Sequence, residues 1–170
     1  MRKILLLLVI VFFAGLVYNI YPENTLPSDV LVDSLVVSKS QYKMFVYQQG
    51  KLLKTYQVSF GGNPVGHKQF EGDEKTPEGH YTINAKNDKS GYNKNLGISY
   101  PNVQDINYAK SIGKSPGGDI KIHGLRNGLG MINKFQRWFN WTNGCVALTN
   151  SEVDELYRSV KLGAGIQIKP

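Results

Sequence analysis

Cysteine is almost absent from this 170-residue chain, which holds a single one, Cys145. One thiol cannot form an internal disulfide, and its distance from the amino terminus excludes lipoprotein processing. Histidine is also scarce, because His67, His80 and His123 are the only three and lie at long, irregular intervals. Those intervals do not match the spacing of zinc ligands, so we expect no metal site. We expect His67 and His80 to be ordinary loop and strand-edge residues.

A long apolar run occurs in one place only. Met1-Arg2-Lys3 precedes an unbroken apolar stretch from Ile4 to Val17, which is the pattern of a secretory signal. No small-x-small cleavage motif follows it. A helix from Ile4 to Ile20 would be about 26 Å long, close to the ~30 Å of a hydrocarbon core. The pattern therefore favours an uncleaved signal anchor over a cleaved signal peptide.

This segment divides the chain into three predicted parts. Residues 1–21 form the anchor or signal peptide, residues 22–29 a linker, and residues 30–170 one domain of ordinary size. The basic pair after Met1 places the amino terminus in the cytoplasm, so the domain would lie outside, in the periplasm or cell envelope. In an oxidising compartment, a lone thiol is a candidate reactive group.

Positive charge predominates, with a formal net charge of +7 at pH 7. This charge favours an anionic partner such as a cell-wall polymer or a membrane surface, although a generally basic solvated surface explains it equally well. The lysines are scattered, and neither a helix-turn-helix nor a zinc-finger pattern is present. We therefore expect no nucleic-acid partner.

Alternating apolar residues and frequent turn signals predict a mainly β (α+β) domain. The expected strands are residues 35–38, 42–47, 52–60, 79–85, 97–102, 119–123 and 165–169. The polar segment 87–97 is expected to be a loop, and residues 105–112 a short helix. The clearest helix follows Leu148. Its expected cap is Thr149 or Ser151, its expected stop is Gly163, and Val160 is expected on its apolar face.

Cys145 and His123 are the candidate catalytic pair. An alternating run ends at His123 and is followed by Gly124, which predicts an imidazole held at a sheet edge. Gly144 permits a tight turn in which the amides of Gly144 and Cys145 could form an oxyanion hole. The alternative is that Cys145 is a small buried apolar residue, and the exported setting makes this less favoured.

Two segments carry a resemblance to a known family. Gly118-Asp119-Ile120-Lys121-Ile122-His123-Gly124 and Trp141-Thr142-Asn143-Gly144-Cys145-Val146-Ala147-Leu148 together resemble the paired signature of the L,D-transpeptidases, the YkuD catalytic domain, in its exported branch. Sortases also place His before Cys, but the Thr-Leu-x-Thr run and nearby arginine of sortases are missing here. Papain-like peptidases place Cys before His. The likeness extends over roughly residues 35–170.

The resemblance implies a β-sandwich or partial barrel of mixed strands with one C-terminal helix and short helical turns. It also implies that Cys145 attacks a peptidoglycan stem tetrapeptide, releases D-alanine and passes the acyl group to an amine. His123 would be the base, oriented by the carbonyl of Gly124, and an imidazolium there would lower the pKa of the thiol. The amides of Asn143, Gly144 and Cys145 would form the oxyanion hole. No cofactor is implied.

Ala147 departs from the family pattern, because many members have arginine or asparagine there to meet a substrate carboxylate. Another cation is then needed. The candidate substrate-binding residues are Arg126, Arg137, Lys75, Trp141, Thr142 and Tyr100, although a core position is the safer expectation for Tyr100. Trp138, Phe139 and Trp141 could form a wall beside the thiol, or could be core residues.

The acceptor of the acyl group stays open. An amine would give a wall cross-link or attach a wall-bound protein, whereas water would make the enzyme an L,D-carboxypeptidase or an amidase. A second class of function is a non-enzymatic, basic peptidoglycan-binding module whose cysteine is structural. The expected partners are stem peptides, the membrane through an uncleaved anchor and, as acceptor, a wall-attached protein.

Overall fold

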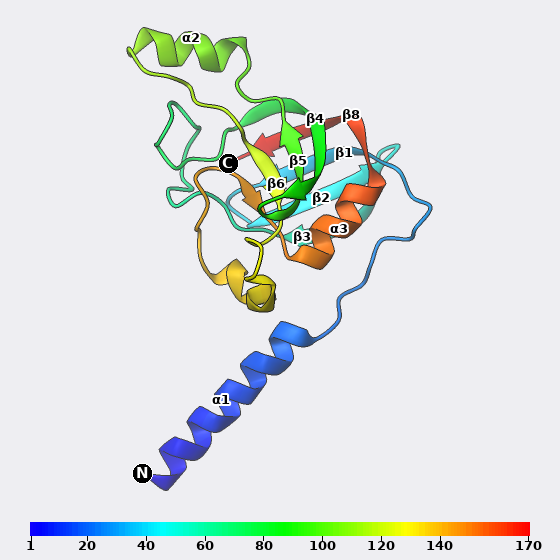
Figure 1. Cartoon of the computed structure of the whole chain (residues 1–170), viewed down its shortest axis with the longest axis vertical. Coiled ribbons are helices and arrows are strands. Elements are labelled where there is room, and N and C mark those ends of the chain that lie inside the picture. The colour runs from blue at the N-terminus through cyan, green and yellow to red at the C-terminus, as the bar shows by residue number, and fades with distance from the viewer.

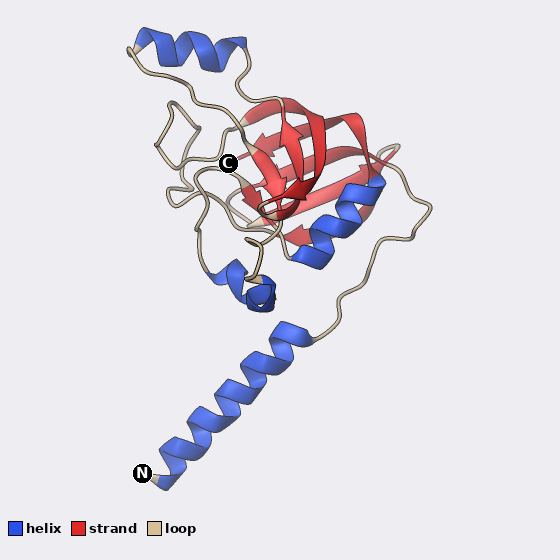
Figure 2. Ribbon diagram, in the orientation of Figure 1, coloured by secondary structure: helices blue, strands red, loops and turns tan.

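A computed structural model describes every residue from Met1 to Pro170, and it shows a curled sheet from which one long helix projects (Figure 1). The sheet has eight strands in the order β3-β2-β1-β8-β4-β5-β6-β7. Their bounds are β1 Val32–Ser38, β2 Lys43–Gln48, β3 Lys51–Gln57, β4 Gly79–Ser90, β5 Asn93–Ile98, β6 Lys121–His123, β7 Val146–Ala147 and β8 Val160–Lys169. The pairs β1–β8 and β6–β7 are parallel and the others antiparallel. The expected mainly β fold with mixed strands and few helices is confirmed (Figure 2).

One apolar core fills the curl of this sheet. It is a cluster of 24 buried residues that includes Val37 of β1, Met44 of β2 and Ile166 of β8. Alternate residues of β1, β2 and β8 enter this core, as the period of two in the sequence predicts. The helix α3 (Asn150–Ser159) packs on β5 and β6 and adds its buried Val153 and Leu156.

The two α-helices of the domain begin at capping residues; Thr149 was expected as the cap of α3, whereas α2 (Val103–Ser111) begins two residues before the expected range 105–112. In α2 the side chain of Asn102 accepts hydrogen bonds from the amides of Gln104 and Asp105. In α3, Thr149 and Glu152 form a reciprocal capping box. Because a side-chain cap satisfies amides that have no partner within the helix, both starting points are fixed locally.

Several predicted strand ends are wrong. Residues 87–97 were expected to form a loop, but β4 continues to Ser90 and β5 begins at Asn93, so this polar segment is a hairpin. The strand expected over 97–102 ends at Ile98, and the one expected over 52–60 ends at Gln57. The hairpin is polar because it extends beyond the core. There the two strands are held together by the pairing of β4 with β5 and not by burial of side chains.

Two other segments differ from expectation. The helix expected to reach Gly163 ends at Ser159, and Val160 begins β8, where it pairs with Val32 of β1. Parallel pairing with β1 therefore replaces the last helical turn. The segment η1 (Gly130–Trp138) consists of 3-10 turns that the sequence did not predict, and a φ of 45° at Asn133 interrupts them. Short 3-10 turns lack a long periodic pattern.

The projecting helix α1 (Arg2–Ile20) lies outside the core. It is long and apolar enough to cross a bilayer, a property that it shares with signal sequences. Asn19 is its one buried residue, and it lies where the end of the helix meets η1. The following segment is also attached to the domain, because Leu26 is buried in the core cluster.

Candidate active site

Cys145 and His123 line the same cavity, which has a volume of about 400 Å³. His123 comes from β6, Cys145 from the loop before β7, and Tyr92 from the β4–β5 turn. The full lining is Ser90, Tyr92, Asn95, Gly118, Asp119, Ile120, Lys121, His123, Trp141, Thr142, Asn143 and Cys145. The fold thus brings a thiol and an imidazole that are 22 positions apart to one solvent-accessible hollow.

The imidazole of His123 is held in a defined orientation. His123 is 6% exposed, and its Nδ1 lies 2.7 Å from the carbonyl oxygen of Gly124. A carbonyl oxygen accepts only, so Nδ1 carries the proton and donates it, and Nε2 is left as an acceptor. Close packing requires glycine at 124, since a Cβ there would lie 2.7 Å from Oδ1 of Asn150. The carbonyl that orients the ring is therefore fixed in position.

The thiol of Cys145 is partly buried and donates to the carbonyl oxygen of Asp119, with 3.7 Å between Sγ and O. It makes no hydrogen bond to His123 in this conformation. Asp119 has a φ of 58°, a left-handed conformation that aspartate tolerates better than most residues. The nucleophile and the imidazole therefore face one cavity, but the thiol proton is held by a backbone carbonyl.

Burial has opposite effects on the two groups. It raises the pKa of the Cys145 thiol and lowers the pKa of the His123 imidazole, because each charged form loses hydration. The Lys121 cation lowers the pKa of His123 further, whereas at Cys145 it opposes the rise that burial causes. The sequence led us to expect an imidazolium that lowers the thiol pKa, whereas these shifts favour a neutral thiol beside a neutral imidazole.

The loop before Cys145 is shaped by Thr142. Its Oγ1 donates to the carbonyl oxygen of Cys145 at 2.8 Å and accepts from the amide of Gly144 at 3.2 Å. The Gly144 amide is thus occupied, unlike those of Asn143 and Cys145, which have no acceptor in the chain. Of the three amides expected to form an oxyanion hole, two remain available to a ligand.

Only glycine fits at position 144. Its φ is 122°, in a region that side chains rarely adopt, and a Cβ there would lie 2.5 Å from the carbonyl oxygen of Lys75. The loop that presents Cys145 therefore packs directly on the backbone of the segment 71–79. This contact gives that segment a supporting role beneath the thiol.

Aromatic rings form one side of the cavity. Tyr92 packs on His123 with 4.8 Å between ring centroids, and Trp141 meets His123 edge-on at 5.6 Å. Trp141 is held by its Nε1, which donates to Oε1 of Gln136 at 3.0 Å. The sequence left open whether Trp138 and Phe139 belong to this wall or to the core, and the structure places them in neither, because both lie outside the cavity and are exposed. Tyr92 was missed because it lies in the hairpin expected to be a loop.

Lys121 is the one cation that lines the cavity. In β6 it alternates with buried Ile122, so Lys121 and His123 share the face that borders the hollow. Its Nζ lies 2.6 Å from Oδ1 of Asp119, whose side chain is 81% exposed. The alternating pattern around His123 could have identified Lys121, but the sequence analysis did not single it out.

The three cations chosen from the sequence lie elsewhere. Arg137 is enclosed by Glu23, at 2.8 and 3.0 Å, and by Glu152, at 2.7 Å. Arg126 borders a separate apolar hollow behind Trp141. Lys75 directs its Nζ toward Gly66, while its backbone carbonyl lies against the Gly144 loop. Charge alone could not distinguish these positions from Lys121.

Two further expectations concern Tyr100 and Ala147. Tyr100 is 5% exposed and donates to the carbonyl oxygen of Pro116 at 2.8 Å, so it is a core residue and not part of the cavity lining. Ala147 is fully buried in β7, opposite His123 in the ladder. It therefore offers no polar group to a ligand.

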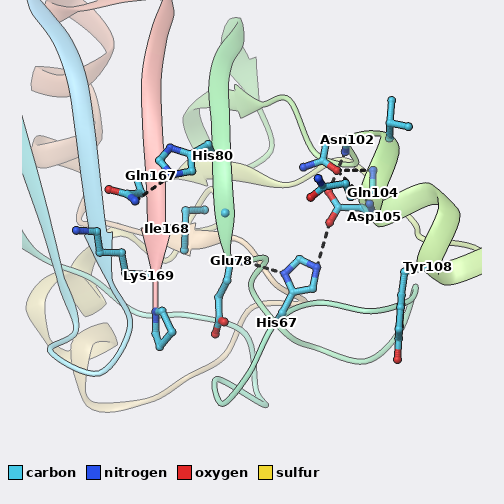
Figure 3. A pocket seen from close by; sticks show the side chains of 13 residues that line it. His67, Glu78, His80, Asn102, Gln104, Asp105, Tyr108, Gln167, Ile168 and Lys169 are labelled. Atoms are coloured by element: carbon cyan, nitrogen blue, oxygen red, sulfur yellow. Dashed lines mark hydrogen bonds and ion pairs between the residues drawn. The ribbon is translucent and has the colours of Figure 1, made fainter.

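A larger hollow, of about 980 Å³, lies between α2 and β8 and contains neither Cys145 nor His123 (Figure 3). There the amide of Glu78 donates to Nδ1 of His67 at 2.9 Å, and Nε2 of His67 lies 3.0 Å from Asp105. His80 meets Gln167 of the neighbouring strand at 3.0 Å. Both histidines link elements of the fold, and no nucleophile lies in this hollow.

Comparison with known proteins identifies relatives along nearly the whole domain. The family profile of the L,D-transpeptidase catalytic domain (YkuD) matches residues 33–168. YafK of Escherichia coli K12, a provisional L,D-transpeptidase, is 28% identical over 180 residues, which cover 94% of this chain and 64% of YafK. YqjB of Bacillus subtilis 168, also a provisional L,D-transpeptidase, is 28% identical over 149 residues, which cover 86% of this chain and 74% of YqjB.

A solved structure has a similar fold. Pgp2 of Campylobacter jejuni, described as a helical cell shape determining protein, superimposes with a TM-score of 0.61 at 27% identity. The match covers 84% of this chain and 49% of the Pgp2 chain. This chain thus spans about half of the Pgp2 structure and 64% of YafK.

Proposed function

Because this chain belongs to the family of L,D-transpeptidase catalytic domains, we propose that it transfers acyl groups of peptidoglycan stem peptides through a thioester at Cys145. The observation that carries this proposal is the shared cavity, in which a thiol, an imidazole with a free Nε2 and an unoccupied amide lie together. A structural cysteine in a wall-binding module would need none of these groups.

The chemistry begins with the release of the thiol proton. The proton leaves the Asp119 carbonyl and passes to Nε2 of His123, while Sγ forms a bond to the substrate carbonyl carbon. The peptide bond after the third residue then breaks, and the imidazolium returns the proton to the leaving D-alanine amine. An acceptor amine next loses a proton to His123 and attacks the thioester; the imidazolium then returns that proton to the departing sulfur, which restores the thiol and the neutral imidazole.

Neutral groups make this route favourable. Starting from a thiol and an imidazole, the proton moves only as charge develops on sulfur, so no buried ion pair is needed beforehand. The oxyanion would accept from the amide of Cys145, whose hydrogen has no other acceptor. One such donor typically contributes roughly 2.7 to 4 kcal/mol to stabilising the transition state.

The test of this function follows masses after the full chain, in detergent, meets a disaccharide tetrapeptide. With an amine acceptor present, we expect a protein adduct equal to the acylated tripeptide, free D-alanine and a product joined to the amine. Without the amine, the adduct should accumulate. Release of tripeptide at the same rate in both cases would assign water as the acceptor. Absence of both adduct and D-alanine would refute the proposal.

Lys121 is the residue that we propose meets the substrate carboxylate in place of a cation at 147. Its ammonium group has three donors, and its exposed Asp119 partner occupies only one of them. We expect Lys121→Met to lower kcat/KM about 10- to 100-fold, mainly through KM, because a hydrogen bond between charged groups is lost. The matched control is Arg126→Met, which removes an exposed cation outside the cavity and should leave KM unchanged.

The same variant should change the pH profile. Activity requires neutral His123, and burial places the acid limb of kcat/KM below the ordinary histidine pKa of about 6.5. Since Lys121 lowers the pKa of His123, its removal should raise that pKa and move the acid limb to higher pH. If Lys121→Met left both KM and the acid limb of kcat/KM unchanged, the proposed role of Lys121 in binding the substrate carboxylate would be wrong.

We also propose that α1 stays attached as a membrane anchor and that the domain works in the cell envelope. Its 19 residues are almost entirely exposed and apolar, and a basic pair precedes the apolar stretch. At 1.5 Å per residue the helix is about 28 Å long, close to the thickness of a hydrocarbon core. Stem peptides of the wall lie on the side to which its carboxyl end would lead.

A further inference from the structure

The carboxyl end of α1 is fastened to η1 by specific polar contacts. Nδ2 of Asn19 donates to the carbonyl oxygen of Met131 at 3.1 Å, and the Lys134 amide donates to Oδ1 of Asn19 at 2.9 Å. The Asn133 side chain donates to the Asn19 carbonyl at 2.6 Å. These contacts join residues more than 110 positions apart in sequence. The helix therefore leaves the domain in one defined direction.

A charged cluster reinforces this attachment just after the helix. Lys134 donates to the carbonyl oxygen of Tyr21 at 2.6 Å and lies 3.2 Å from Glu23. Arg137 binds both carboxylate oxygens of Glu23, and its hydrogen bonds hold the pKa of that carboxyl at about 2. Both cations of η1 are thus buried and paired with carboxylates.

Aromatic contacts fix the position of η1 along the axis of α1. Tyr18 stacks on Trp138 with 6.0 Å between centroids, and a Cβ at Gly15 would lie 3.8 Å from the Phe135 ring. Gly15 lies five positions before Ile20, the end of the helix, which is about 7.5 Å along its axis. A helix of about 28 Å can barely span a hydrocarbon core of ~30 Å, so both of its ends must lie at the hydrocarbon boundary.

The side chains that η1 exposes suit that depth. Met131 is 84% exposed, Trp138 60% and Phe139 66%, and Leu129 and Ile132 are exposed beside them. Tryptophan and other large apolar side chains favour the interface between headgroups and acyl chains. Apolar side chains gathered on one face of a soluble domain mark a contact surface.

We propose that η1 and Phe139 form a lipid-contacting platform, defined by Met131, Trp138 and Phe139, that enters the outer boundary of the bilayer beside α1. This inference rests on the proposed membrane anchor, not on the catalytic assignment. Lipid is the expected contact because the platform adjoins α1. Since α1 is just long enough to span the hydrocarbon core, η1 must lie at the hydrocarbon boundary and not above it. Lipid headgroups and acyl chains would replace water around these side chains.

The side chain of Trp141 lies between the platform and the catalytic cavity. Gln136 of η1 holds Trp141, which borders the catalytic cavity and also an apolar hollow of about 300 Å³ that Phe139 helps to line. Docking would therefore fix the height and tilt of the thiol above the membrane. Stem peptides close to the bilayer would be the ones within reach.

The test uses the two tryptophans of the chain. In the full-length Trp141→Phe variant, Trp138 is the sole tryptophan, and its emission is excited selectively over that of tyrosine. The protein is reconstituted into vesicles of phosphatidylethanolamine and phosphatidylglycerol with or without bromine on the acyl chains. We expect brominated lipid to quench Trp138 several-fold more than a sole tryptophan at Val103. That control, Val103→Trp with both native tryptophans changed to Phe, lies on α2, exposed and at the opposite end of the molecule from α1 (Figure 1).

Flotation of the vesicles tests the membrane anchor separately from the platform. Protein that floats while Trp138 is quenched no more than the α2 control would overturn the platform and leave the anchor intact. Protein that does not float would overturn both. A short-wavelength emission without bromine quenching would assign the surface to a second protein chain and not to lipid. Asn19→Leu should float but show weaker quenching, and unchanged quenching would refute the role of Asn19 in holding the platform.

Discussion

Replacing Cys145 by alanine should lower D-alanine release by roughly 10⁴- to 10⁶-fold and abolish the protein adduct, because the group that forms the thioester is gone. His123→Gln should lose a comparable part of the rate but keep a thiol that iodoacetamide can modify. The measurement is release of D-alanine from disaccharide tetrapeptide, with intact-protein mass for the adduct.

His80→Gln is the matched control for the histidine change, since His80 lies on β4 outside the cavity and bonds only to Gln167. It should keep full activity. Circular dichroism should show that all three variants are folded. If Cys145→Ala released D-alanine as fast as the unchanged chain, the thioester mechanism would be wrong, and retained binding to isolated wall would then favour the binding module.

Gly144→Ala should lower kcat/KM about 10²- to 10³-fold, which is the usual cost of losing one oxyanion donor. The added Cβ would lie 2.5 Å from the carbonyl oxygen of Lys75, so the loop must move and carry the Cys145 amide with it. The backbone at 144, with a φ of 122°, adds strain of its own. Steady-state kinetics and urea unfolding of the same protein measure the two effects.

The matched control is Gly113→Ala, at a glycine with a φ of 69° and nothing within 4 Å of its added Cβ. This change introduces strain without a clash, and it lies in the turn after α2, away from the cavity. We expect it to lower stability by about 1 kcal/mol and to leave kcat/KM unchanged. Equal losses of activity in the two variants would show that strain, and not the position of the Cys145 amide, explains the effect.

Part of the site could be predicted because the information is local. The alternation of Lys121, Ile122 and His123 puts the imidazole on the face opposite the core, whatever lies further away. The paired segments around His123 and Cys145 resemble those of a known family, which the family match over residues 33–168 confirms. Caps such as Thr149 with Glu152 are likewise complete within four residues.

The protonation state and the choice of cation could not be predicted in this way. The pKa shifts of Cys145 and His123 arise from burial by elements distant in sequence. Arg137 and Lys121 carry the same charge, but Arg137 is enclosed by Glu23 and Glu152 while Lys121 borders the cavity. The alternation around His123 could have pointed to Lys121, but no pattern within a few residues of Arg137 shows that two distant carboxylates enclose it.

The sequence by itself determined the strand-rich character of the domain, the start of α3 and the identity of the candidate nucleophile and base. Each of these depends on neighbours within one turn or one strand, where side-chain period and capping act. The tertiary structure decided the polar β4–β5 hairpin, the end of α3 at Ser159 and the attachment of α1 to η1. Those features are fixed by strand ladders and hydrogen bonds between distant segments, whose partners are chosen only when the whole chain has folded.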